Sequence, residues 1–244
     1  EIGSANGTVE VFFDDFQFTN GSIGHAEATD YLEDFTDTFA GSTINLTRYV
    51  VADWGLTTNQ NEFLNITGTD VGGDDSAGGI RLNFSEVGVI NTSSSFFISF
   101  YVNMSNASGI TNSSGYLDTW LSVDTATWVE DAGDSLAVCQ IFTNQSGSYL
   151  GVDSGEVTPL SLSDTEGTLI LAYNASNYNY TCYFDDVNLT TNNQSSPDDD
   201  FMFNLLGDAF YTSIDLALDN LNFSYGDYVV AAEEAQVTLT DFTD

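Results

Sequence analysis

Basic residues are almost missing from this chain of 244 residues. It has no lysine and only two arginines against 37 acidic residues, which gives a formal net charge of −35 at pH 7. Proteins bind nucleic acids largely through Lys and Arg contacts to phosphates, and anionic membranes attract basic segments in the same way. The composition therefore excludes nucleic acid and anionic lipid as partners.

The side chains that serve most catalytic centres are scarce as well. His25 is the only histidine, and its glycine-rich surroundings predict an exposed loop position. Zinc sites need clusters of Cys and His, and Ser/His/Asp catalysis would depend on this one histidine without a Gly-x-Ser-x-Gly motif. The sequence therefore predicts a protein that is not an enzyme.

Long apolar runs are absent, and cysteines are few. No stretch approaches the roughly 20 apolar residues that cross a bilayer, so no transmembrane segment is expected. The chain begins at Glu1 rather than Met, from which we expect that a leader has been removed. Cys139 and Cys182 lie in β-patterned stretches, and an even number in an exported chain favours a disulfide over the alternative of two buried thiols.

What the chain has in excess is Asn-x-Ser/Thr, the acceptor pattern for N-linked glycans. Fifteen of its 21 asparagines are in this pattern, whereas its 52 Ser and Thr residues would place only about four or five there by chance. They are Asn6, Asn20, Asn45, Asn65, Asn83, Asn91, Asn103, Asn106, Asn112, Asn144, Asn174, Asn179, Asn188, Asn193 and Asn222. The alternative is an accident of Ser/Thr-rich loops. The excess predicts a secreted or cell-surface protein that carries N-linked glycans.

Strand patterns run through the whole sequence. Hydrophobic residues make up 42% of the chain, which is ample for a packed core, and proline is nearly absent. Alternating segments separated by turn residues predict strands at Val9–Phe18, Glu62–Ile66, Gly79–Phe84, Phe96–Asn103, Tyr116–Val123, Leu136–Thr143, Gly167–Tyr173, Tyr178–Phe184, Phe201–Leu206, Ser213–Phe223 and Gln236–Phe242. Only Ala26–Phe39 has helical spacing, and one short helix is expected there. The pattern predicts an all-β, two-sheet antiparallel β-sandwich or jelly roll with strand-like terminal extensions.

The alternation shifts by one residue at two places. Apolar positions change face at Asp219-Asn220 and at Asp185-Asp186. One extra residue reverses the face of a strand, so a bulge or a tight turn produces such a shift. We expect a bulge at the first place and a hairpin turn at the second.

Several segments in order resemble the C-terminal half of a concanavalin A-like, laminin-G-like jelly roll. They read TLILAY at 168–173, YTCYFDD at 180–186, FMF at 201–203 and DLALDNLN at 215–222. Asp34-Phe35 and Phe96–Val102 resemble the opening segment and the first long core strand of that family. The chain departs from the family at Asp186, where the hairpin glycine is expected, and at Glu166-Gly167, where a Trp is usual. The resemblance implies the jelly-roll fold over about residues 9–225.

The resemblance also makes a glycosidase motif worth seeking. Glycosidases with this fold carry a Glu-x-Asp-x-x-Glu strand, in which alternation places the carboxylates on one face. None of the 11 glutamates here has an aspartate two residues later, and Glu130-Asp131 with Asp134 has a different spacing. Because this motif is missing, an acidic glycosidase ranks third among the functions considered, well behind a structural glycoprotein and a carbohydrate-binding adhesin.

Calcium is the expected cofactor, because hard oxygen ligands suit it. Asp70, Asp74 and Asp75 lie in a glycine-rich segment that could surround an ion. Asp14 and Asp15 with Asp219 are the second candidate, because the first and last strands are neighbours in related jelly rolls. The alternative for either group is a solvated acidic loop.

Aromatic residues suggest a platform for sugar rings. The candidates are Trp54, Trp120, Trp128, Tyr149, Tyr178 and Tyr180, with core packing as the alternative. The two cations, Arg48 and Arg81, are expected to pair with carboxylates rather than to hold a ligand.

The chain divides into an N-terminal extension at residues 1–8, a jelly roll at 9–225 and a C-terminal extension at 226–244. The strand-like ends suggest that a terminal segment pairs with the sheet edge of another copy, with pairing inside the domain as the alternative. We therefore expect a structural glycoprotein that assembles with copies of itself into a surface layer, filament or sheath. The second hypothesis is a calcium-dependent adhesin that binds cell-surface glycans.

Overall fold

The computed structural model describes residues 31–70, 76–104, 110–125, 135–152, 158–191 and 200–229. The elements are β1 (Phe35–Asp37), β2 (Tyr49–Trp54), β3 (Thr57–Gln60), β4 (Leu64–Thr69), β5 (Ser76–Leu82), α1 (Phe84–Val87), β6 (Phe96–Met104), β7 (Tyr116–Thr125), β8 (Ser135–Asn144), β9 (Gly147–Val152), β10 (Leu160–Leu162), β11 (Glu166–Asn174), β12 (Asn179–Phe184), β13 (Val187–Thr190), β14 (Phe201–Phe210) and β15 (Ser213–Tyr225).

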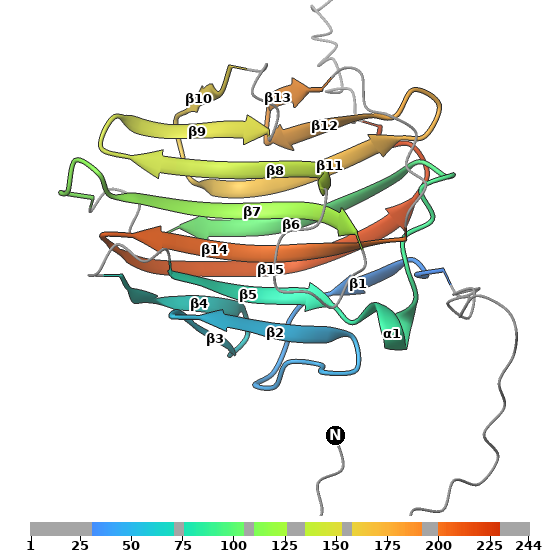
Figure 1. The fold of residues 1–244 in the computed structure, drawn as a ribbon, viewed down its shortest axis with the longest axis horizontal. Coiled ribbons are helices and arrows are strands. Elements are labelled where there is room, and N and C mark those ends of the chain that lie inside the picture. Colours follow the sequence, from blue (N-terminus) through green and yellow to red (C-terminus); the bar gives the residue numbers. More distant parts are fainter. Residues whose placement is uncertain are drawn as a thin grey trace, which may run out of the picture.

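The strands form two antiparallel sheets packed face to face. The front sheet has seven strands in the order β10-β9-β8-β7-β14-β5-β2, and it lies before the back sheet in the view of Figure 1. The back sheet has eight strands, β13-β12-β11-β6-β15-β4-β3 together with β1, which pairs with β15. The predicted all-β sandwich is thereby confirmed, while the predicted strands of the two termini lie outside the described residues.

The core lies between the sheets because every second side chain of a strand points toward the opposite sheet. In β6 every second side chain is buried, and Phe96, Ile98 and Phe100 have no exposed surface. The inward residues of β7 and β14 lie side by side on these neighbouring strands, as Leu121 and Leu205 do, and they belong to the same core. Apolar burial of this kind supplies most of the stability of a sandwich.

Both expected phase shifts occur where the sequence places them. The ladder between β15 and β6 changes register between Asp219 and Asn222, and Asn220 adopts a left-handed φ of 52°. The bulge separates the part of β15 that pairs with β4 from the part that pairs with β1. At the other place a two-residue turn, Asp185-Asp186, joins β12 to β13.

The helix expected at Ala26–Phe39 is wrong over residues 31–39, the part that the structure describes. Phe35–Asp37 forms strand β1 against Leu221–Phe223 of β15. Phe35 stacks on Phe203 and Phe223, because the apolar side chains that suggested a helical face serve this edge of the core instead.

Six short strands were also missed (β1, β2, β3, β9, β10 and β13), and the strand expected to reach Phe84 ends at Leu82 before α1.

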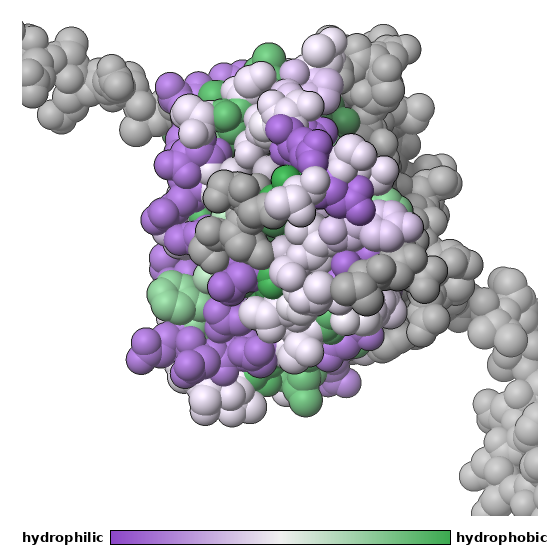
Figure 2. Space-filling model, turned by 90° about the vertical axis from the view of Figure 1, so that its left-hand side faces the viewer, coloured by the Kyte–Doolittle hydropathy of each residue, from purple (hydrophilic) through white to green (hydrophobic). Residues whose placement is uncertain are grey.

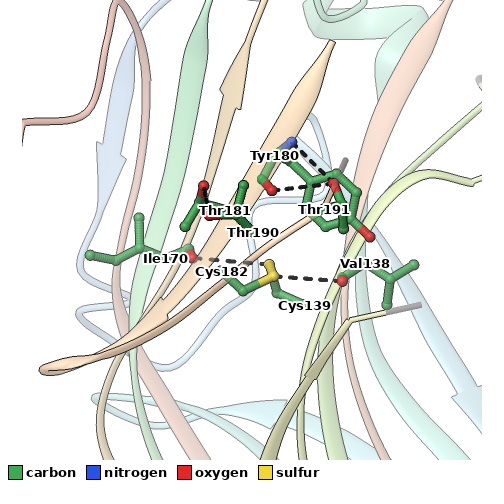
Figure 3. The surroundings of a disulfide bond; sticks show 8 residues. All are labelled: Val138, Cys139, Ile170, Tyr180, Thr181, Cys182, Thr190 and Thr191. Atoms are coloured by element: carbon green, nitrogen blue, oxygen red, sulfur yellow. Dashed lines mark hydrogen bonds between the residues drawn. A yellow bond between two sulfur atoms is a disulfide. The ribbon is translucent and has the colours of Figure 1, made fainter. Parts of the chain in front are cut away.

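A disulfide joins the two sheets. Cys139 in β8 and Cys182 in β12 are bonded, with a Cα–Cα distance of 5.5 Å, as the sequence predicted. Figure 3 shows the bond between the sheets, beside the hydrogen bonds that link Tyr180 to Thr191.

The part of the chain that the structure describes contains no helix with the length and hydrophobicity of a membrane span.

Candidate functional site

The outer face of the front sheet gathers polar and aromatic side chains from its central strands. In β7 the odd-numbered residues point into the core, so Asp118, Trp120, Ser122 and Asp124 alternate onto the outer face. Asn204 and Asp208 occupy the same face of the neighbouring strand β14. We call the outer surface along β7 and β14 the seam.

Cross-strand pairing brings two carboxyl groups together on the seam. Asp118 lies directly opposite Asp208 of β14 on one side and Phe142 of β8 on the other. Tyr149 of β9 continues the same row beyond Phe142. Directly opposed side chains in a sheet have Cβ atoms about 4.5–5.5 Å apart, so the two carboxyl groups are neighbours.

Three side chains of the seam hold a buried polar atom that has no hydrogen-bond partner. They are Asp118 through Oδ1, Trp120 through Nε1 and Asn204 through Oδ1. They occupy positions over three rows of the sheet, a span of about 13 Å at the rise of a strand. Buried polar groups in proteins are nearly always hydrogen-bonded, so three orphaned atoms on one face favour a ligand there.

The amide of Asn204 is held by its neighbours while its oxygen is not. Its Nδ2 donates to Ser122 Oγ at 3.1 Å and to Asp124 Oδ2, and the Ser122 hydroxyl donates to the same carboxylate oxygen at 2.6 Å. Asn204 is only 3% exposed. These bonds orient the amide, so the free acceptor Oδ1 has a defined direction.

The carboxyl group of Asp118 has unusual acid–base behaviour. Burial, followed by the charge of Asp208, raises the pKa of Asp118 from its ordinary 3.8 to about 8. Both causes disfavour the ionised form, so Asp118 is mostly protonated at neutral pH. The pair can then offer both a donor and an acceptor to a ligand.

Aromatic rings flank the carboxyl pair. The ring centroid of Tyr116 lies 5.4 Å from that of Phe142 and 5.3 Å from that of Phe210. The three rings form a continuous strip across β8, β7 and β14. Next to this strip, a cavity of about 380 Å³ is lined by Gln140, Phe142, Tyr149, Gly151, Thr158 and Pro159. Such rings present flat apolar surface beside polar groups, as small-molecule sites commonly do.

The aromatic residues that the sequence suggested as a platform for sugar rings do not share one surface: some lie on this outer face and others in or against the core. Trp54, Trp120 and Tyr149 lie on the outer face of the front sheet, whereas Tyr180 is buried and Tyr178 packs against the core. Trp128 lies outside the described residues.

The two arginines contact aromatic rings. The guanidinium of Arg81 lies 4.7 Å from the ring centroid of Trp54, and that of Arg48 lies 4.3 Å from the ring centroid of Phe35. Arg48 also pairs with Asp37, Nη1 to Oδ2 at 3.7 Å, as expected from the sequence.

The structure describes two of the six aspartates proposed as calcium ligands. Asp70 is buried, and its Oδ2 accepts the backbone N–H of Tyr211 at 2.7 Å. Asp219 Oδ1 accepts the N–H of Asn220 at 2.7 Å, at the bulge. Asp14, Asp15, Asp74 and Asp75 lie outside the described residues. In the described part of the chain no three Asp, Glu, His or Cys side chains gather into a metal-binding group.

The structure describes eleven of the fifteen predicted glycosylation sites, and none of these asparagines is buried. Asn45, Asn112, Asn174 and Asn188 are exposed, and the others are partly exposed. The remaining four, Asn6, Asn20, Asn106 and Asn193, lie outside the described residues. Occupation by glycans stays a prediction.

A second hollow lies at the end of the sandwich that carries the β8–β9 turn. It measures about 410 Å³ and is lined mainly by residues 143–148 and 163–165. This end faces the viewer in Figure 2, where the surface is mostly hydrophilic with small, separate hydrophobic areas. The Thr143 hydroxyl in this hollow donates to Ser148 Oγ at 2.9 Å, and none of the buried polar atoms found without a partner in the described residues belongs to its lining.

Comparison with known proteins identifies the fold. No family model and no curated protein matches the sequence. An immunostimulatory antigen and pseudo beta-1,3-glucanase of Mycobacterium tuberculosis is 12% identical with a TM-score of 0.53, covering 79% of this chain and 98% of that one. Peanut lectin with a nine-residue peptide is 11% identical with a TM-score of 0.51, covering 80% and 100%. The carbohydrate recognition domain of Emp47p is 12% identical with a TM-score of 0.50, covering 79% and 95%.

These likenesses establish the architecture of this chain. It has the concanavalin A-like jelly-roll fold that lectins and glucanases share, as the sequence resemblance implied. At such low identity the comparisons speak for the fold alone.

Sequence reasoning found part of the seam and missed the rest. Trp120 was named for its ring, but Asp118, Asp208 and Asn204 were not named at all. The alternation of Asp118, Trp120, Ser122 and Asp124 in β7 was a usable signal of one polar face. The partner residues on β14 could not be assigned, because cross-strand register is not visible in a single sequence.

Proposed function

We propose that this chain is a non-enzymatic, extracellular carbohydrate-binding module whose ligand lies on the seam. The observation that carries the proposal is the set of orphaned buried atoms, Asp118 Oδ1, Trp120 Nε1 and Asn204 Oδ1, beside a strip of aromatic rings. Sugar hydroxyls donate and accept hydrogen bonds, and the apolar faces of sugar rings pack on aromatic side chains. A glycan therefore satisfies both features at once.

Three further observations support an extracellular carbohydrate-binding module. The fold is shared with peanut lectin and with the Emp47p carbohydrate recognition domain. The disulfide is consistent with an oxidising, extracellular compartment. The glycosidase motif is missing from the sequence, which favours binding over hydrolysis. Assembly of copies through donated strands stays a prediction, because residues 1–30 and 230–244 lie outside the described residues.

The test is binding of neutral oligosaccharides to the full chain, with Phe142→Ala beside the seam and Phe97→Ala as its matched control. Both residues are partly buried phenylalanines on outer sheet faces, but Phe97 lies on the back sheet against Tyr228. We expect Phe142→Ala to weaken binding about tenfold, the loss of roughly 1.4 kcal/mol of ring contact, and Phe97→Ala to leave it unchanged.

Two outcomes would contradict the proposal: no oligosaccharide binds, or both variants weaken binding equally. Release of shortened sugars would overturn the non-enzymatic part. Binding that is lost in EDTA would assign calcium to the site, with Asp14, Asp15, Asp70, Asp74, Asp75 and Asp219 as the candidate ligands, and binding that survives EDTA would remove calcium from it.

A further inference from the structure

The carboxyl pair at the centre of the seam is costly to the fold. Asp118 and Asp208 are directly opposite across β7 and β14, and like charges in this position destabilise a sheet. Asp118 Oδ1 is buried without a partner. The pair therefore needs a proton or a cation to relieve it.

The surroundings of the pair are aromatic. Phe142 is the neighbour of Asp118 on the side away from Asp208, and Tyr116 and Phe210 occupy the next row of the same face. Ring faces attract organic cations through their quadrupole, so carboxyl groups between rings form an environment suited to an ammonium group.

A second, independent acceptor lies on the same seam. Asn204 is nine-tenths buried or more, its amide nitrogen is bonded to Ser122 and Asp124, and its Oδ1 has no partner. Of the three orphaned atoms on this face, Asp118 Oδ1 and Asn204 Oδ1 are acceptors and Trp120 Nε1 is a donor, so the ligand needs more donors than acceptors here. An amine with adjacent hydroxyls meets this requirement, whereas a carboxylated sugar would add acceptors and negative charge.

We infer that the Asp118–Asp208 pair binds an ammonium group, and that the preferred ligand of the seam is a glycan containing unacetylated hexosamine. This inference rests on the proposed function. Calcium fits the pair less well, because Ca²⁺ requires six to eight oxygen ligands and no third carboxylate joins this pair in the described part of the chain. The net charge of −35 opposes uronic acid and sulfated glycans.

Binding of an ammonium group should release a proton from Asp118. Among the described residues, the titratable or charged side chains of the same face are Asp208 on β14, Tyr116 and Asp124 on β7, Tyr149 on β9 and Arg81 on β5. A cation between the two carboxyl groups favours their ionised forms, and Asp118 is the member that holds a proton at neutral pH. A neutral sugar has no such effect.

The experiment is calorimetry of the full chain with three tetrasaccharides of the same linkage: glucosamine, N-acetylglucosamine and glucose. Titration in buffers of different ionisation enthalpy counts the protons released. We expect glucosamine to bind at least about tenfold more tightly than the other two, a difference of 1.4 kcal/mol, with proton release at neutral pH. In Asp118→Asn and Asp208→Asn the tenfold preference should disappear, and in Asp118→Asn the proton release as well.

The control is Asp186→Asn, which removes one charge from the exposed β12–β13 turn. If it weakens glucosamine binding as much as Asp118→Asn does, the preference is general attraction to an acidic protein and the inference fails. If all three tetrasaccharides bind equally and Asp118→Asn changes nothing, the inference fails while the proposed function stands. If none binds, the proposed function itself fails.

Discussion

Individual residues carry more than one role in this chain, and the sequons show it clearly. In five of them the asparagine Oδ1 accepts the backbone N–H of the Ser or Thr two residues later: Asn45, Asn91, Asn112, Asn144 and Asn174. This is the Asx turn, in which a short polar side chain closes a loop. Turn formation is therefore a second physical reason for the pattern, beside glycan attachment.

At the same scale, Asp118 should make the stability of the protein depend on pH. Its pKa is raised to about 8 in the fold, above the unfolded value, so the folded state holds an extra proton between about pH 4 and pH 8. The stability that this proton contributes is fully present below about pH 4 and is lost as the pH rises to about 8. Asp118→Asn removes this loss, and we expect the variant to exceed the wild type by at least about 1 kcal/mol at pH 8.

Denaturant unfolding at several pH values, with a metal chelator present, measures this effect. Asp186→Asn serves as the control, because its side chain is exposed in a turn. Parallel stability curves for the wild type and Asp118→Asn would show that the Asp118 carboxyl group is already ionised in the fold.

Among the elements, the strands with strict alternation were predictable and the short edge strands were not. The period-2 pattern of β6 and β15 comes from one buried face, and that face is written in the local sequence. β1 has only three residues, and its strand conformation comes from pairing with β15. Tyr31, Leu32, Phe35 and Phe39, which lie in and around β1, mimic a helical period, and this explains the incorrect helix.

The middle of β5 depends on a glycine that no other residue replaces. Gly79 has a φ of +147°, and a Cβ there would overlap the Leu205 carbonyl oxygen and lie 2.9 Å from Leu206 Cα in β14. We expect Gly79→Ala to cost about 3 kcal/mol or more, because backbone atoms of β14 cannot move aside.

Gly41→Ala is the matched control for this substitution. Gly41 also has a positive φ, +98°, but nothing lies within 4 Å of its added Cβ, so only backbone strain of about 1 kcal/mol is expected. Thermal unfolding of both variants separates the steric effect from the conformational one. Equal losses at the two positions would contradict the close approach of β5 and β14.

On the scale of the whole molecule, the disulfide holds the sheets together. It closes a sequence separation of 43 residues between β8 and β12, which corresponds to about 4 kcal/mol of restricted unfolded chain. We expect Cys139→Ala/Cys182→Ala and the reduced wild type to lose stability by about this amount in denaturant unfolding. Reductant should leave the double variant unchanged, and a loss below about 1 kcal/mol in it would show that packing alone joins the sheets.

The charge of the whole molecule should make it sensitive to salt. A net charge of −35 repels itself in the compact state, and salt screens this repulsion. We expect the melting temperature to rise by about 5 °C between about 20 mM and about 500 mM NaCl, and calcium to act beyond its ionic strength if the aspartates bind it. A melting temperature indifferent to both would show that the acidic excess serves solubility alone.

The sequence by itself determined the fold class, the acidic surface and the strands that carry the cysteines. These properties follow from composition and from a two-residue period, both of which are local in the chain. The tertiary structure decided that Asp118 faces Asp208, that Phe142 completes their row, and that Phe35 belongs to a strand. Register between distant strands and the pairing of short edges depend on non-local contacts, and the seam is composed of such contacts.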